Sequence, residues 1–333
     1  MPHGLQWTSR RRPRDDAQRA DRGRRGPPRR RRRRHATLLD SAPVPPYEGV
    51  VDSHLPRPAP ERAWEFLRTA QDDDIPLVWA ALTIARDEYP DLDIDAYEQR
   101  IAAWSERLRG AGDGDPMQGL RALNALVFDE LGMSGNQQDY YDPRNSYLNE
   151  VLDRRLGIPI SLGVVQMDIA QRAGLPLQGV SFPGHFLVSL PVDGGLLVLD
   201  PFSRGRSIDA QELKTRAKPH VGDQDIHDDQ LSMLLAPASK RAILTRMLRN
   251  LKALYAEKED WARALRCADR LLTLDPAQPE ERRDRGLLYL RVGHVAAARE
   301  DLSAYLAQVP PPDDARKVRE VMLQSAREKG RVN

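Results

Sequence analysis

Cysteine is nearly absent from this chain, which contains one, Cys267, among 333 residues. A single thiol excludes an intrachain disulfide and a zinc site built from several cysteines, and it favours a reducing compartment. No apolar run approaches the roughly 18 residues that cross a bilayer, and the N-terminus lacks the apolar segment of a secretory signal. We therefore expect a cytoplasmic protein with no membrane association.

Lysine is also scarce, with 7 residues against 44 arginines, and the arginines are unevenly distributed. Residues 1–34 contain 14 arginines and three aspartates, a net charge of +11, which leaves −9 for the rest of the chain. Residues 1–59 are rich in Arg and Pro and carry almost no periodic apolar pattern, so they cannot bury enough surface to fold. We expect a disordered arm there.

An arginine-rich arm can bind nucleic acid, because it displaces counterions from the phosphate backbone. No aromatic residues interleave these arginines, which favours the other interpretation, an extension foreign to the native protein. A nucleic-acid partner is therefore expected only through the arm, and only if residues 1–55 are native.

From residue 60 onward, apolar residues recur at helical spacing. Pro76, Pro90 and Gly110 divide the first part into three short helices, and a fourth spans about residues 117–131. A polar loop, residues 132–144, follows. The pattern predicts a folded domain that begins with helices.

Residues 145–202 change from a helical period to a strand-like one after Gly174, which predicts two helices followed by two strands. Ser161 lies where the second helix starts, His185 at the start of a strand and Asp200 at the end of the next. These residue types can serve as a nucleophile, a general base and an orienting acid.

A helix is expected near residues 209–216, and a polar loop with His220, His227, Asp228 and Asp229 follows it. These side chains could ligate a metal, but their spacing is neither helical nor tetrahedral. We expect a solvated loop and no metal site.

The last third of the chain repeats itself with a period of 34 residues, which is the tetratricopeptide signature. Equivalent positions carry matching residues: Leu254 and Leu288, Tyr255 and Tyr289, Ala264 and Ala298, Pro276 and Pro310. We predict two repeats, residues 243–276 and 277–310, and a capping helix over 313–329. Cys267 is expected to be a buried structural thiol within the first repeat.

Two repeats bury little surface by themselves, so part of the first repeat helix, Leu244 to Tyr255, is expected to pack on the preceding domain. The two domains would then form one rigid body. Side chains near Asn250, Lys252 and Asp284 are expected to line a concave face that binds an extended polar peptide.

Several spaced motifs in the central stretch resemble a known family. They read NSYLN from 145, RR from 154, GIPISL from 157, PGHFL from 183 and DPF from 200. With the C-terminal repeats, they resemble the SirB family of bacterial proteins, which pair a transglutaminase-like core with tetratricopeptide repeats. The resemblance implies an α+β fold, with a papain-like core of N-terminal helices and a small antiparallel sheet, followed by an all-α repeat domain.

We place the transglutaminase-like domain at residues 60–217, a linker at 218–242 and the repeat domain at 243–330. In active enzymes of this kind, the resemblance implies a cysteine at the position of Ser161. A thiol has a pKa of about 8.5, whereas a serine hydroxyl must lose its proton to a base during attack. Cys267, in a repeat helix, cannot substitute.

Three interpretations of Ser161 remain open: a nucleophile with His185 as base and Asp200 as orienter, a helix N-cap, or part of a pocket that binds without turnover. The last two are favoured. His185 could equally be a core histidine, and Asp200 could merely initiate a turn. Asn145 and Asn149 could donate toward the site, as an oxyanion hole does, although Asn145 could instead cap its helix.

We therefore predict a non-catalytic protein-binding or scaffold module that needs no cofactor and binds a protein or peptide through its repeats. The alternative is a serine-dependent hydrolase or acyltransferase that acts on peptide or amide substrates. Catalysis requires Ser161 Oγ within hydrogen-bond reach of one His185 nitrogen, with Asp200 on the other.

Overall fold

Helices dominate the first part of the folded chain. The computed structural model describes residues 58–222, 225–308 and 314–330, so the expected arm, apart from its last two residues, lies outside the described residues. The first elements are η1 (Pro60–Arg62), α1 (Ala63–Thr69), α2 (Leu77–Arg86), α3 (Ile94–Glu106) and α4 (Pro116–Asn124), which continues into the π-helical turn η2 (Ala125–Glu130). The four predicted helices are confirmed.

The second group of elements begins later than the sequence pattern predicts. A 3-10 turn, η3 (Pro143–Asn145), precedes helix α5 (Leu148–Arg154). Pro143 is the first residue of this turn, and the Asp142 side chain caps its start by accepting a hydrogen bond from the Arg144 N–H. Asn145 therefore does not cap α5. The short strands β1 (Ser134–Gly135) and β2 (Leu156–Gly157) pair in parallel, and β2 leads into α6 (Pro159–Arg172).

The sheet is an antiparallel meander in the order β3-β4-β5-β6. Its strands are β3 (Gln178–Val180), β4 (Leu187–Val192), β5 (Gly195–Asp200) and β6 (Arg206–Ile208), with the 3-10 turn η4 (Pro201–Ser203) between the last two. One face packs on α6, where the absent side chain of Gly163 makes room for Phe186 and Val188. The opposite face buries Leu187 in a separate apolar cluster.

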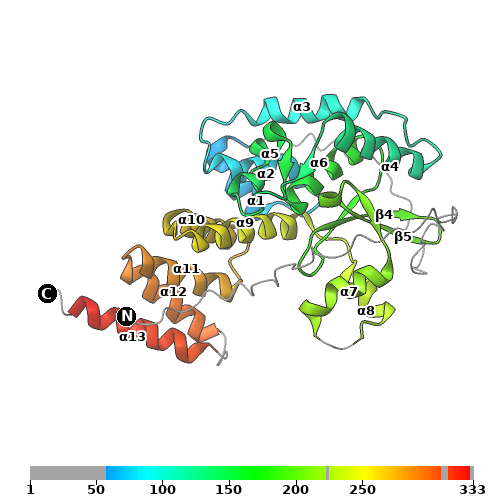
Figure 1. The fold of residues 1–333 in the computed structure, drawn as a ribbon. Helices are drawn as coiled ribbons and strands as arrows, with labels where there is room; N and C mark the ends of the chain where they lie inside the picture. Colours follow the sequence, from blue (N-terminus) through cyan, green and yellow to red (C-terminus); the bar gives the residue numbers. More distant parts are fainter. Residues whose placement is uncertain (1–57, 223–224, 309–313, 331–333) are drawn as a thin grey trace, which may run out of the picture. The chain divides into compact units, whose positions relative to one another are not determined.

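Helices α7 (Ala210–Val221) and α8 (Asp228–Leu234), shown in Figure 1, add Leu213, Ala217 and Leu231 to that cluster. The helix predicted near 209–216 is confirmed and runs five residues further. The prediction of a solvated loop at Asp228 and Asp229 is wrong, because both residues lie in the first turn of α8, whose Leu231 is fully buried in the cluster.

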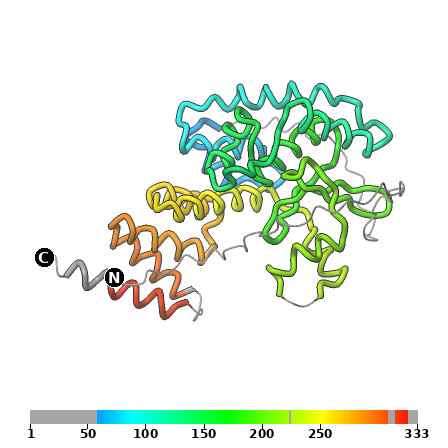
Figure 2. Tube along the Cα trace, viewed as in Figure 1, coloured from blue at the N-terminus to red at the C-terminus, as the bar shows by residue number. Residues whose placement is uncertain are grey.

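The repeat region is entirely helical. It contains α9 (Lys240–Glu257), α10 (Trp261–Leu274), α11 (Pro279–Arg291), α12 (Val295–Gln308) and α13 (Ala315–Gly330), shown from yellow to red in Figure 2. Consecutive helices pack on one another, most closely in the pairs α9 with α10 and α11 with α12. The prediction of an all-helical repeat region is confirmed, and the terminal helix begins at Ala315.

The first helices of the repeat region pack on the region that precedes them, as the sequence predicts. Leu244, Leu248 and Leu251 of α9 are buried, and the hydroxyl groups of Tyr255 and Tyr147 lie 2.8 Å apart. Helix α9 contacts α2, α6 and η3, while α10 contacts α1. The described residues all belong to one compact unit.

Charged groups reinforce this contact. Arg263 donates two hydrogen bonds to the carboxylate of Glu88, at 2.6 and 2.8 Å, and Arg270 does the same to Asp87, at 2.7 and 2.8 Å. The guanidinium of Arg270 also lies 4.5 Å from the centre of the Trp64 ring. These paired contacts fix α10 against the end of α2.

The described residues thus form a mostly helical region with small sheets, followed by an all-helical region. Among these residues, none of the helices combines the length and apolar character needed to cross a bilayer.

Candidate functional site

A tight turn presents His185. Residues Phe182 to His185 form a β-turn in which the His185 N–H donates to the Phe182 carbonyl at 3.1 Å. Pro183 suits the second position of such a turn, and Gly184, with φ of 70°, adopts the left-handed conformation that the third position of a type II turn requires. A Cβ atom at Gly184 would also clash with the ring of His220.

His185 and Asp200 form a hydrogen-bonded pair. The register of β4 and β5 pairs Val188 with Leu199, so the end of β5 lies beside the start of β4. His185 Nε2 lies 2.9 Å from Asp200 Oδ1, and the side chains are 19% and 2% exposed. The sequence prediction that Asp200 orients His185 agrees with this geometry.

The Asp200 carboxylate is held in its ionised form. Besides His185, it accepts hydrogen bonds from Ser203 Oγ at 3.0 Å and from Arg216 Nη1 at 3.1 Å. Burial alone raises the pKa of Asp200, but the hydrogen bonds from His185, Arg216 and Ser203, together with the charge of His185 when it is protonated, outweigh burial and hold this pKa well below its usual range. Arg216 carried no signal in the sequence, because its partner lies 16 residues away.

Because an ionised carboxylate only accepts, Nε2 of His185 carries the proton that it donates to Asp200. The other ring nitrogen, Nδ1, forms no hydrogen bond within the described part of the chain. Asp200 therefore fixes the orientation of the His185 ring through one of its two nitrogens.

Ser161 is not the N-cap of α6 but its third residue, and the N-cap is Ile158. Its Oγ accepts the N–H of Ile158 at 3.1 Å, which is half of a capping box, and donates to the Asn145 carbonyl at 2.6 Å. The side chain is fully buried. None of the hydrogen bonds of Ser161 in the described structure reaches His185.

The two asparagines serve different purposes. Asn145 Nδ2 donates to the carbonyls of Asp139 and Tyr140 at 2.7 and 3.3 Å, so its donors fix the preceding loop and do not point to a substrate oxygen. Asn149 is buried in α5, and its Oδ1 has no partner among the described residues.

An aromatic ledge, formed by Phe202, Tyr140 and Tyr141, lies next to Asp200. Phe202 stacks edge-on with Tyr140 at 5.6 Å between ring centres, and Tyr140 does the same with Tyr141 at 5.4 Å. The Phe202 ring lies against the backbone of Gly135, where a Cβ atom would be 2.4 Å from it. Tyr141 is 58% exposed. The adjacent tyrosines were visible in the sequence, but nothing there indicated their contact with Phe202.

The repeat face differs from expectation at Lys252. Lys252 is only 5% exposed, and its ammonium group is enclosed between the carboxylates of Glu281 and Asp284. Such a group stabilises the packing of α9 on α11 and cannot contact a peptide, so the expectation that Lys252 lines a binding face is wrong. Asn250 and Asp284 are half-buried.

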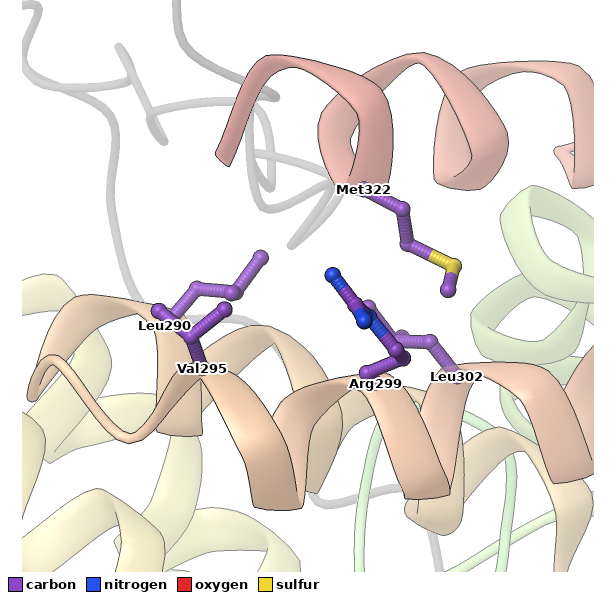
Figure 3. A pocket seen from close by; sticks show the side chains of 5 residues that line it. All are labelled: Leu290, Val295, Arg299, Leu302 and Met322. Carbon is purple, nitrogen blue, oxygen red and sulfur yellow. The ribbon is translucent and has the colours of Figure 1, made fainter. Parts of the chain in front are cut away.

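A shallow apolar cleft lies further along, where α13 crosses α11 and α12 (Figure 3). Its lining residues come from all three helices: Leu290, Val295, Arg299, Leu302 and Met322. In the described ranges, no three His, Cys, Asp or Glu side chains gather as a metal site would need.

Comparison with known proteins agrees with this architecture. Residues 95–249 match the transglutaminase-like superfamily, and residues 251–323 match the tetratricopeptide repeat. A UPF0162 protein of Xylella fastidiosa (strain 9a5c) is 52% identical over 258 residues, which cover 77% of this chain and 92% of the relative.

More distant relatives share the same region. A UPF0162 protein of Vibrio cholerae is 31% identical over 246 residues, 73% of this chain and 84% of the relative. Protein SirB1 of Salmonella typhimurium is 30% identical over 193 residues, 57% of this chain and 70% of the relative. No solved structure matches significantly.

Proposed function

Because the chain belongs to the family of transglutaminase-like proteins with tetratricopeptide repeats that includes the UPF0162 and SirB1 proteins, we propose that it is a non-catalytic module that binds a protein or peptide partner. One observation carries the non-catalytic part of this proposal: Ser161 Oγ donates to the Asn145 carbonyl, and among the described residues none of its hydrogen bonds reaches a basic side chain.

A reaction at Ser161 would first have to break this arrangement. Rotation of Oγ toward a base breaks its hydrogen bonds to the Asn145 carbonyl and the Ile158 N–H, which then keep only their long 3.4 Å bond to each other, at a cost of about 1–3 kcal/mol. The fully buried side chain also has no room for a substrate carbonyl beside it. Ser161 therefore acts as a helix-capping group.

The single thiol offers no substitute nucleophile. Cys267 lies in α10, and burial raises the pKa of its thiol to about 12, so the thiolate is absent at neutral pH. Thiol-based transamidation or proteolysis has no reactive group in this chain.

Binding is assigned to the repeats because such arrays present extended surfaces, and because the first repeat is fixed on a rigid support. A peptide selected for binding to the full chain from a displayed library should form photocrosslinks with α9 and α11. Crosslinks confined to the transglutaminase-like region would contradict binding by the repeats and would show that the peptide binds to that region.

The non-catalytic part is tested by a fluorophosphonate probe, which labels activated serines. We expect no labelling of the wild-type chain at Ser161. Stoichiometric labelling that disappears in both Ser161→Ala and His185→Gln would overturn the proposal.

The second candidate is a serine-dependent hydrolase or acyltransferase on peptide or amide substrates, and the 2.9 Å bond between His185 and Asp200 favours it. In that reaction, Ser161 Oγ bonds to the substrate carbonyl carbon while its proton passes to His185 Nδ1. The same proton then goes to the leaving amine as its bond to carbon breaks. The probe experiment distinguishes the two functions.

A further inference from the structure

A helix of the repeat region holds the turn that carries His185. Arg246, in α9, donates from Nη1 to the Phe182 carbonyl at 3.0 Å and to Ser181 Oγ at 2.9 Å. The same Phe182 carbonyl accepts the His185 N–H that closes the turn. The Phe182 carbonyl oxygen thus links the backbone of His185 to Arg246 of α9, which lies 64 residues after Phe182.

The strand before this turn is held by the segment that enters α9. Ala238 N–H donates to the Gly179 carbonyl at 2.7 Å, and Pro237 forms an isolated bridge with Val180. A Cβ atom at Gly179 would lie 3.1 Å from Ile243 of α9, so the helix packs directly on the strand.

The residue after His185 is fixed by the same helix. The guanidinium of Arg246 lies 5.9 Å from the centre of the Phe186 ring. That ring is fully buried against Gly163 of α6, the helix that contains Ser161. Arg246 therefore contacts the chain on both sides of His185.

We infer that Arg246 is a positioning residue for His185 and that the first half of α9 completes the His185 site. The transglutaminase-like match runs to residue 249 and includes Arg246, whereas the repeat match begins at 251. The inference stands whether or not Ser161 reacts, since it concerns only how His185 is held.

The test measures the hydrogen bond between His185 and Asp200 in the full chain by NMR. The Nε2 proton of His185, assigned by its loss in His185→Gln, reports this bond through its exchange with water. In Arg246→Met, which keeps the aliphatic bulk and removes the donors, exchange should be about tenfold faster, as expected from the loss of one charged hydrogen bond. Arg246→Lys, which retains a charged donor, should exchange at an intermediate rate.

The matched control is Arg249→Met. Arg249 lies one turn further along α9, but it donates to Glu281 and Gln278 of the repeat region and not to the turn. Its replacement should leave the exchange rate of the His185 proton at the wild-type value.

A wild-type exchange rate in Arg246→Met would overturn the inference, as would equal acceleration in Arg249→Met. If Arg246→Met does not fold, Arg246→Lys decides: faster exchange than wild type supports positioning by Arg246, and an unchanged rate contradicts it.

Discussion

At the scale of single residues, the hydroxyl of Ser161 contributes to the stability of the fold. Ser161→Ala removes the hydroxyl that accepts from the Ile158 N–H and donates to the Asn145 carbonyl, and these two groups keep only their long 3.4 Å bond to each other. We expect the free energy of unfolding to fall by about 1–3 kcal/mol, because two buried groups lose their better hydrogen-bond partner. Urea denaturation measures this change.

Ser189→Ala is the matched control. Ser189 is also fully buried, but its Oγ has no partner among the described residues. Ser189→Ala should leave the free energy of unfolding unchanged or raise it slightly, because the substitution removes a buried polar group that has no hydrogen-bond partner. Equal destabilisation by the two substitutions would show that the hydrogen bonds of Ser161 contribute nothing specific.

Asp200 makes stability depend on pH. Its folded-state pKa lies below the ordinary value of 3.8, so its stabilising effect is fully present above about pH 4 and is lost as pH falls toward the folded-state pKa. Asp200→Asn should cost about 3 kcal/mol at pH 7, because Arg216 and His185 lose a buried charged partner.

The difference between wild type and Asp200→Asn should shrink as the pH falls from about 4 toward 2, since only the wild type loses stability from this carboxylate there. Urea denaturation at several pH values across this range measures the difference. A constant difference would mean that the ionised carboxylate is not the stabilising species.

At the scale of elements, the turn before β4 depends on a glycine. Gly184→Ala places a side chain on a residue in the left-handed conformation and against the ring of His220. The free energy of unfolding should therefore fall by about 2–4 kcal/mol. Gly194→Ala, in the next turn of the same sheet, is the control. Gly194 has φ of 80° but no atom within 4 Å of the added Cβ, so the free energy of unfolding of this variant should fall by only about 1 kcal/mol.

Thermal denaturation compares the two glycine variants. The larger loss in Gly184→Ala should be accompanied by a weaker hydrogen bond between His185 and Asp200, because the turn that presents His185 is distorted. Equal losses would mean that His220 moves aside without cost.

Long helices and strands were predictable because the same periodic pattern of residues extends over many positions. The 34-residue period predicted the repeat helices, and strand alternation predicted that β5 ends at Asp200. Helix α8 was missed because it is seven residues long and buries only Leu231, which is too little for a periodic pattern.

The details of the site could not be predicted, because they depend on atoms far apart in the sequence. The direction of the Ser161 hydroxyl is set by the carbonyl of Asn145, 16 residues earlier. The burial of Lys252 is set by Glu281, 29 residues later. Local patterns contain no information on such pairs.

At the scale of the whole molecule, the paired contacts of Arg263 with Glu88 and of Arg270 with Asp87 couple the repeats to the transglutaminase-like region. The pKa of Glu88 is lowered, chiefly by the hydrogen bond from Arg263, which indicates a favourable pair. The carboxylate side chains are 19% and 18% exposed, so water screens them less than surface charges. We therefore expect the two regions to unfold together in the wild type.

The double variant Asp87→Asn, Glu88→Gln should separate the two unfolding events. Each bidentate pair contributes about 2 kcal/mol, so their joint loss should let the repeats unfold at a lower temperature than the core, as two calorimetric transitions. Asp115→Asn is the control, since Asp115 pairs with Arg121 at 3.4 Å on the surface and should leave one transition. A single transition in the double variant would mean that the apolar contacts of α9, including the pair Tyr147 and Tyr255, suffice to couple the regions.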